Sequence, residues 1–113
     1  MHELAVTEGI LDMVLNEAKK RNVERVVAIN LVVGEMTGIE EDCIRFYFDI
    51  LSENTPAGGA KIAVKYEKPL FRCTGCDRVF ERKNFTFSCP YCGYPGVLAQ
   101  KGVELYIESI EVE

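Results

Sequence analysis

The sequence lacks the features that would place it in a membrane or in an export pathway. Its longest apolar stretch, residues 26–33, is interrupted by Asn30 and is far shorter than the roughly 20 residues that a membrane-spanning helix needs. No Lys or Arg precedes Lys19, so the positively charged first region of a secretory signal peptide is missing. We therefore expect a cytoplasmic protein that has no membrane partner.

The sequence also lacks an excess of positive charge, an internal repeat and any low-complexity tract. Its 113 residues carry 13 Lys and Arg against 18 Asp and Glu, and the resulting formal net charge of -5 opposes attraction to a phosphate backbone. With 48% hydrophobic and 27% charged residues, the composition is that of an ordinary folded domain. A protein that coats nucleic acid and a large multidomain assembly are both disfavoured.

The spacing of apolar residues predicts two helices and a first strand. Apolar residues at helical spacing predict a helix over residues 4–21, with Asn22 as its stop. A β-branched run predicts a strand over residues 26–33, and Thr37 with Glu40 matches a capping box at the start of a second helix. The residues predicted to lie on the apolar side of that helix are Cys43, Phe46, Tyr47, Ile50 and Leu51.

Two further strands are predicted, one on each side of a cysteine-rich segment. Alternation of apolar with polar residues predicts a strand over residues 62–66 and another over residues 103–112, with a bulge at Ser109. The predicted fold class is therefore α+β, with a three-stranded sheet packed with two helices and an inserted zinc-ribbon-like lobe that carries four cysteines.

The four cysteines lie within residues 68–98, a lobe that we expect to be a domain inserted between residues 1–67 and residues 99–113. They are Cys73, Cys76, Cys89 and Cys92, with the spacing C-x2-C-x12-C-x2-C. Each pair is expected to form a turn that aims two thiolates at one point, and four thiolates in a tetrahedron suit Zn²⁺. Since four protein ligands leave no position for a reacting water, we expect a structural site; iron and a redox dithiol are the alternatives to zinc.

The lobe also combines aromatic with basic residues, a composition that would suit a zinc-ribbon adaptor for nucleic acid or for a transcription component. Its five Lys and Arg exceed its two acidic residues by three. A Zn²⁺ held by four thiolates contributes about -2, which leaves the lobe at about +1. So weak a charge favours aromatic rings that pack around the metal turns over a nucleic-acid footprint.

His2 is the only histidine of the sequence, and Glu3 follows it. An imidazole near a free terminus can join neighbouring backbone nitrogens in one chelate, and nitrogen donors in a plane suit Ni²⁺ or Cu²⁺. On the residues alone, an exposed histidine without a ligand role remains the alternative.

Four features, in this order, resemble the HypA/HybF family of nickel metallochaperones. They are Met1-His2-Glu3-Leu4, the segment Gly34-Glu35-Met36-Thr37-Gly38-Ile39-Glu40, the sequence Arg45-Phe46-x-Phe48, and the two C-x-x-C pairs. The resemblance covers nearly the whole chain, and the order and spacing of the features are more specific than any one of them. It implies a non-catalytic protein with a structural zinc site that delivers Ni²⁺ for the maturation of [NiFe] hydrogenase, with urease as another recipient.

The resemblance also implies ligands and partners. The family's nickel site falls on the imidazole of His2 and on the backbone nitrogens around His2 and Glu3, with carboxylate help from Glu3 and Glu40. Because Glu40, Glu41 and Asp42 are consecutive, the sequence leaves open which carboxylate reaches the metal. The implied partners are a nickel-associated GTPase and the hydrogenase large-subunit precursor, without nucleic acid, and the chain itself is expected to be a monomer or a homodimer.

Overall fold

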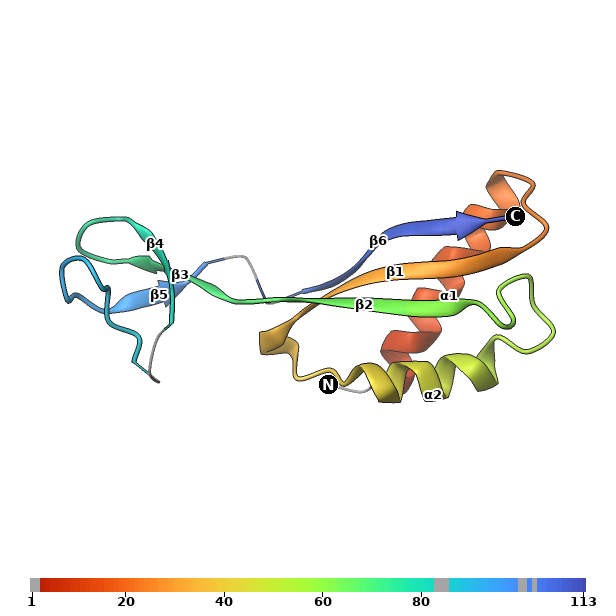
Figure 1. Cartoon of the computed structure of the whole chain (residues 1–113), viewed down its shortest axis with the longest axis horizontal. Coiled ribbons are helices and arrows are strands. Elements are labelled where there is room, and N and C mark those ends of the chain that lie inside the picture. Colours follow the sequence, from red (N-terminus) through yellow and green to blue (C-terminus); the bar gives the residue numbers. More distant parts are fainter. Residues whose placement is uncertain (1–2, 83–85, 100–101, 103) are drawn as a thin grey trace. The chain divides into compact units, whose positions relative to one another are not determined.

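The computed structural model describes residues 3–82, 86–99, 102 and 104–113. These residues belong to two compact units, whose course along the chain can be followed by colour in Figure 1. Unit 1 comprises Met1–Val32, Gly38–Lys65 and Tyr106–Glu113, and unit 2 comprises Val33–Thr37 and Tyr66–Leu105.

Unit 1 begins with the helix α1, Glu3–Lys20, which confirms the first predicted helix. Its buried stripe includes Ile10, Val14 and Ala18. The helix stops at Asn22, which adopts the left-handed conformation with φ 53, while the N–H of Val23 donates to the carbonyl oxygen of Ala18 at 2.9 Å. A short polar residue such as asparagine tolerates this conformation, and the hydrogen bond satisfies a carbonyl that the end of the helix would leave open.

The sheet of unit 1 has the strand order β2-β1-β6. These strands are β1, Val26–Gly34, β2, Lys61–Glu67, and β6, Leu105–Val112. In Figure 1, β1 and β2 run in the same direction and β6 returns in the opposite one. The helix α2, Glu41–Leu51, makes the crossover that two parallel strands require. Because α1 crosses behind the strands and α2 packs against α1, both helices lie on one face of the sheet, and the predicted three-stranded α+β arrangement is confirmed.

The central strand β1 supplies much of the core of unit 1. Fully buried residues of this core are Val14, Val26, Ile29, Leu31, Val32, Ile44 and Phe48. The outer strand β6 is less covered, and its half-buried positions are Leu105, Ile107 and Ile110. The pattern of burial therefore shifts by one residue between Ile107 and Ile110, where the sequence predicts a bulge.

The predicted capping box at the start of α2 is wrong. Thr37 ends the short 3-10 helix Glu35–Thr37, and its hydroxyl donates to the carbonyl oxygen of Gly34 at 2.8 Å. Glu40 is itself the residue that precedes the first turn of α2, and its side chain makes no capping hydrogen bond. The helix begins at Glu41, too far from Thr37 for that hydroxyl to cap it.

The predicted apolar side of α2 is wrong in part, because Cys43, Tyr47 and Leu51 are half-buried but the other two predicted residues are exposed. Ile44 and Phe48 are fully buried, whereas Phe46 and Ile50 are 62% and 55% exposed. Apolar residues occur on both sides of this helix, so spacing alone cannot identify the buried side. In the structure the guanidinium of Arg45 donates two hydrogen bonds, of 3.1 and 2.9 Å, to the carbonyl oxygen of Ile62 in β2, and this contact fixes how the helix is rotated against the sheet.

Unit 2 contains a second three-stranded sheet, which is antiparallel and has the order β4-β3-β5. These strands are β3, Leu70–Cys73, β4, Val79–Glu81, and β5, Gly96–Leu98. Phe71 of β3 lies opposite Phe80 of β4 and Leu98 of β5. A Cβ atom at Gly96 would lie 2.5 Å from Cζ of the Phe80 ring, so only glycine leaves room for this ring over the sheet.

Replacing Phe48 by alanine should lower the free energy of unfolding by about 3–5 kcal/mol, because it deletes a fully buried ring from the core of unit 1. Phe46→Ala is the matched control on the same helix. It should lower the free energy of unfolding by less than about 1 kcal/mol, because its ring is mostly exposed. Denaturant titration followed by circular dichroism measures both, and equal losses would contradict the observed orientation of α2.

Candidate metal centre

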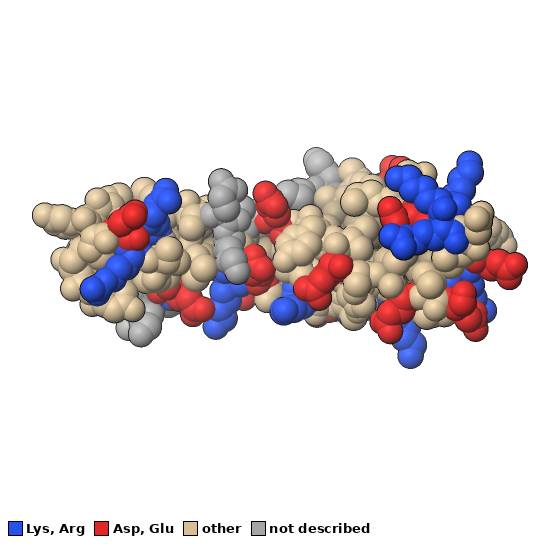
Figure 2. Space-filling view, turned by 90° about the horizontal axis from the view of Figure 1, so that it is seen from above, with Lys and Arg blue, Asp and Glu red and all other residues tan. Residues whose placement is uncertain are grey.

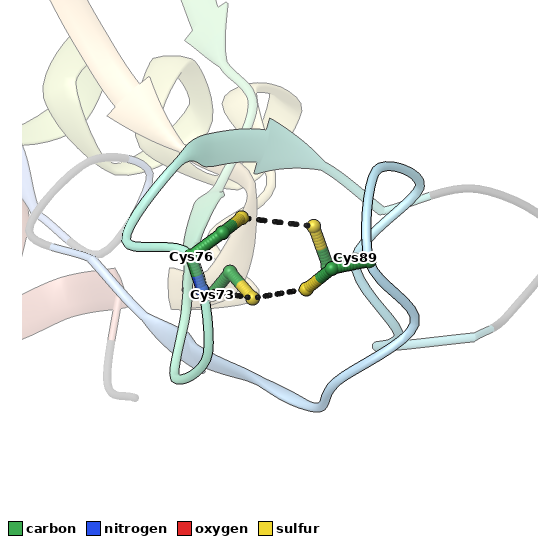
Figure 3. A group of neighbouring side chains, drawn as sticks. Cys73, Cys76 and Cys89 are labelled. Carbon is green, nitrogen blue, oxygen red and sulfur yellow. Dashed lines mark hydrogen bonds between the residues drawn. The ribbon is translucent and has the colours of Figure 1, made fainter.

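The four cysteines of the lobe meet at one point, as their spacing predicts. Their sulfur atoms all lie within 4.8 Å of one another, and Figure 3 shows the side chains of Cys73, Cys76 and Cys89 pointing inward. The Sγ atoms of Cys73 and Cys92 are 3.2 Å apart, and those of Cys76 and Cys89 are 3.7 Å apart. Zn–S bonds of about 2.3 Å in a tetrahedron require sulfur separations of about 3.8 Å, so the cluster fits a zinc ion.

The first turn is built around the sulfur of Cys73, the last residue of β3. The backbone N–H groups of Gly75 and Cys76 donate to this sulfur at 3.2 and 3.3 Å. The ring of Tyr94 lies directly against Gly75, where a Cβ atom would come within 1.8 Å of Cδ2 of the ring. Glycine therefore lets the turn close tightly while the tyrosine covers it.

The second turn is built in the same way around the sulfur of Cys89. The backbone N–H of Tyr91 donates to this sulfur at 3.4 Å. The chain then reverses at Gly93, which has φ 82, and the N–H of Cys89 donates to the carbonyl oxygen of Tyr94 at 2.8 Å. Hydrogen bonds from N–H groups stabilise a thiolate, so both turns are prepared to bind a cation.

Two of the sulfurs show how strongly the cluster favours a bound cation. Burial opposes the thiolate of Cys73, but hydrogen bonds from the N–H of Cys76, from the thiol of Cys92 and from the N–H of Gly75 lower the pKa of Cys73 to about 6. The N–H of Tyr94 favours the thiolate of Cys92, yet the neighbouring sulfur of Cys73 and burial raise the pKa of Cys92 to about 11. The thiolate of Cys73 thus disfavours a second thiolate at Cys92, and a bound divalent cation would stabilise both.

The chemistry of this donor set is structural. Cys73 and Cys89 are buried and form a small core with Phe71 and Phe80. Four thiolates complete the tetrahedral coordination of zinc and leave no open position for a substrate or for a reacting water. Within the described part of the chain, these cysteines are the one group of His, Cys, Asp and Glu side chains that are close enough together to hold a metal.

The aromatic residues of the lobe form the expected small core only in part. The rings of Phe71 and Phe80 are buried, and their centroids lie 6.0 Å apart. Tyr91 and Tyr94 are instead 62% and 61% exposed. The guanidinium of Arg78 lies over the Tyr91 ring, 4.6 Å from its centroid, so this cation is already engaged within the lobe.

The residues expected to bind nickel belong to unit 1. His2 lies outside the described residues. Glu3 is the first residue of α1 and is half-buried, and the hydroxyl of Thr7 donates to its carbonyl oxygen at 2.6 Å. Glu40 is exposed and directly precedes α2. Both carboxylates therefore lie at the beginnings of helices.

The structure distinguishes the three consecutive carboxylates that the sequence cannot. Glu41 forms an ion pair with Arg45 at 2.9 Å, and Asp42 approaches the same guanidinium at 3.7 Å. The side chain of Glu40 forms no ion pair and no capping hydrogen bond with any residue that the structure describes. In the sequence, Arg45 stands out only as part of the motif Arg45-Phe46-x-Phe48, although its spacing of four residues from Glu41 is typical of an ion pair on a helix.

The fold and the centre define a small α+β metalloprotein that carries a zinc-holding unit with four cysteines. A family model described as "Hydrogenase/urease nickel incorporation, metallochaperone, hypA" matches residues 1–112. The hydrogenase maturation factor HypA of Caldanaerobacter subterraneus subsp. tengcongensis is 57% identical over 114 residues, with 100% of both chains covered. The hydrogenase maturation factor HybF of Shigella boydii is 31% identical, again with 100% of both chains covered. The chain therefore belongs to the HypA family of nickel metallochaperones for hydrogenase maturation.

Solved structures share this fold. The solution structure of the Ni metallochaperone HypA from Helicobacter pylori is 21% identical, with a TM-score of 0.69 and coverage of 99% of this chain and 97% of that one. A further solution structure of a HypA protein, also 21% identical, gives a TM-score of 0.78. Among the described residues, no helix is both long and apolar enough to cross a membrane.

Replacing Cys89 by serine should abolish zinc binding and unfold the sheet of unit 2. The binding energy of a structural zinc, about 10–16 kcal/mol in small peptides, far exceeds what the four-residue core can supply. Unit 1 has its own core and should stay folded. Metal analysis and heteronuclear NMR spectra of the full chain measure both effects, and Cys43→Ser, which leaves the cluster intact, is the control. A Cys89→Ser protein that keeps one zinc and its unit 2 signals would contradict the assignment.

Proposed function

We propose that this chain carries Ni²⁺ on a site in unit 1, separate from the zinc centre. The ligands of this site are the imidazole of His2, the backbone nitrogens around His2 and Glu3, and the carboxylates of Glu3 and Glu40. Nitrogen and oxygen donors of this kind suit Ni²⁺ and hold it less permanently than four thiolates do. A carrier needs such a site, because it must release its cargo.

Two properties of the described residues support a nickel site that is separate from the zinc centre. The four cysteines already fill the coordination of one zinc ion, so a transported metal needs other ligands. The observation that carries the proposal is the state of Glu40, whose carboxylate is exposed, while Glu41 and Asp42 are engaged by Arg45. Of the three consecutive carboxylates, Glu40 is the one that can bind a metal without breaking an ion pair.

The zinc-binding domain in this proposal is residues 68–98, inserted into a nickel-binding domain of residues 1–67 and 99–113. The chain acts in the cytoplasm as a carrier and catalyses no reaction. Its partners are a nickel-associated GTPase and the hydrogenase large-subunit precursor. Support comes from the relatives, whose names describe hydrogenase maturation factors, and from the family description, which includes urease beside hydrogenase.

The alternative, a zinc-ribbon adaptor for nucleic acid, is not favoured by the lobe. Arg78 and Arg82 lie over rings of the lobe itself, 4.6 Å from the Tyr91 centroid and 5.2 Å from the Phe87 centroid. Phosphate binding would have to compete with these contacts. The family match also covers residues 1–112, so no long segment is left that would need an adaptor function to explain it.

Replacing His2 by alanine should weaken Ni²⁺ binding by about 100-fold or more, because the site loses its only side-chain nitrogen. Isothermal titration on protein without added residues before Met1 measures the affinity, and zinc content should stay at one per chain. Unchanged nickel affinity in His2→Ala would overturn the proposed site, and retention of the wild-type protein on heparin or DNA would favour the adaptor.

Replacing Glu40 by glutamine should weaken Ni²⁺ binding by about tenfold, because a neutral amide oxygen is a poorer ligand than a carboxylate. Asp42→Asn is the matched control, since it removes a neighbouring charge that is 3.7 Å from Arg45. The same titration should give nearly the wild-type affinity for this variant. Equal losses in the two variants would show that only the overall negative charge matters, which is contrary to the proposal.

A further inference from the structure

The strand β6 is one edge of the sheet in unit 1, and β2 is the other. The outer side of an edge strand presents N–H and C=O groups to which a further strand can pair. The edge β2 is protected by Lys61 and Lys65, which are both exposed. The sequence of β6 contains no Lys, Arg or Pro, and none of its residues is buried.

An apolar groove of about 500 Å³ runs along β6, between this strand and α1. The apolar residues that line it are Met13, Val14, Ile107, Ile110 and Val112. Met13 and Val112 are 58% and 45% exposed, although both point apolar surface into the groove. Figure 2 views the molecule from the side on which β6 lies in Figure 1, and it shows uncharged surface between acidic and basic side chains.

The basic charge that borders this groove is already neutralised. Arg21 lines the groove, and its Nε atom lies 3.0 Å from a carboxylate oxygen of Glu17, one turn earlier on α1. At the end of β6, Arg25 approaches Glu113 at 3.7 Å. Each of these two arginines therefore has an acidic partner, and the glutamates of β6 lie beside them.

Of the glutamates of β6, Glu108 lines the groove itself, whereas Glu111 lies on the face opposite the groove. The amide of Asn30 in β1 donates to the hydroxyl of Ser109 at 3.0 Å and to the carboxylate of Glu111 at 3.3 Å. Because Ile29 and Leu31 point into the core, Asn30 points away from the helices, and its two partners share that face. An added strand would thus meet mainly apolar side chains on the groove face and the carboxylate of Glu111 on the other.

We propose that β6 and the groove beside it dock an extended segment of a partner protein in which apolar and basic residues alternate. The segment pairs with the outer side of β6 as a fourth strand of the sheet. Its apolar side chains enter the groove against Met13 and Ile110, and its basic side chains lie on the other face beside Glu111. Backbone hydrogen bonds supply affinity in this mode of recognition, and the alternating side chains supply specificity.

A second copy of the chain is a poorer occupant. Pairing through two β6 strands would place glutamates opposite glutamates, and like charges that face each other across strands are destabilising. The net charge of -5 adds to this repulsion. Pairing of β6 with the basic edge β2 of a second copy would be head-to-tail and would extend without closing.

The first test titrates a capped octapeptide of four Val-Lys repeats, which matches the eight residues of β6, into the zinc-loaded full chain. Heteronuclear NMR should show shift changes concentrated in β6 and around Met13, together with slower amide exchange in β6. An octapeptide of four Val-Glu repeats is the control, and it should bind at least about tenfold more weakly because its charges repel those of the strand. Equal binding of the two peptides, or shifts confined to other elements, would overturn the proposal.

Variants then separate the two faces of the strand. Glu111→Lys should weaken binding of the Val-Lys peptide by about fivefold, with Glu53→Lys as the charge-matched control. Met13→Gln should weaken it by a similar factor of about five, with Ile50→Gln as the control, since Met13 and Ile50 are 58% and 55% exposed apolar residues on helices. Peptide binding that is unchanged in both variants would refute the proposal. Sedimentation that shows self-association through β6 would also refute it. The assay needs no nickel, so its outcome is independent of the proposed carrier function.

Discussion

Four sulfur atoms within 4.8 Å of one another are the constraint on which the fold of unit 2 and the division of metal sites depend. Four thiolates so close together repel one another without a cation, and the pKa of Cys73 falls to about 6 while that of Cys92 rises to about 11. With zinc they join two turns and three short strands that otherwise share a core of only four residues. Because four thiolates complete the coordination of this zinc, it is structural and is not the transported metal. A carrier with this lobe therefore has to bind its transported metal elsewhere.

In unit 1, one arginine links the fold to the proposed nickel site. The guanidinium of Arg45 holds α2 to the carbonyl oxygen of Ile62 and also engages Glu41. The first contact fixes the rotation of the helix, and the second occupies the carboxylate next to Glu40. A position directly before α2 is thereby left with an unengaged carboxylate, where the positive end of the helix dipole also favours negative charge.

Much of this could be predicted from the sequence, because the relevant signals are local. The apolar spacing of α1, the β-branched run of β1 and the cysteine spacing each depend on a few neighbouring residues. The buried side of α2 could be predicted only in part, since Phe46 and Phe48 are equally apolar and tertiary contacts, such as that of Arg45 with a strand distant in the sequence, select between them. Which carboxylate among residues 40–42 has no ion pair could not be predicted for the same reason, because this depends on where Arg45 lies in the fold. The role of His2 stays a prediction, because that residue lies outside the part of the chain that the structure describes.

The central claim is that two metals occupy two chemically different sites, a thiolate cage for zinc and a nitrogen and oxygen site for nickel. X-ray absorption at the nickel edge, recorded on zinc-loaded protein to which one equivalent of Ni²⁺ has been added, tests this most directly. The account predicts a nickel coordination shell of nitrogen and oxygen donors without sulfur, while zinc remains at one per chain with sulfur ligands at about 2.3 Å. Nickel–sulfur scattering accompanied by loss of zinc would contradict it, because the cage would then be the binding site of the cargo.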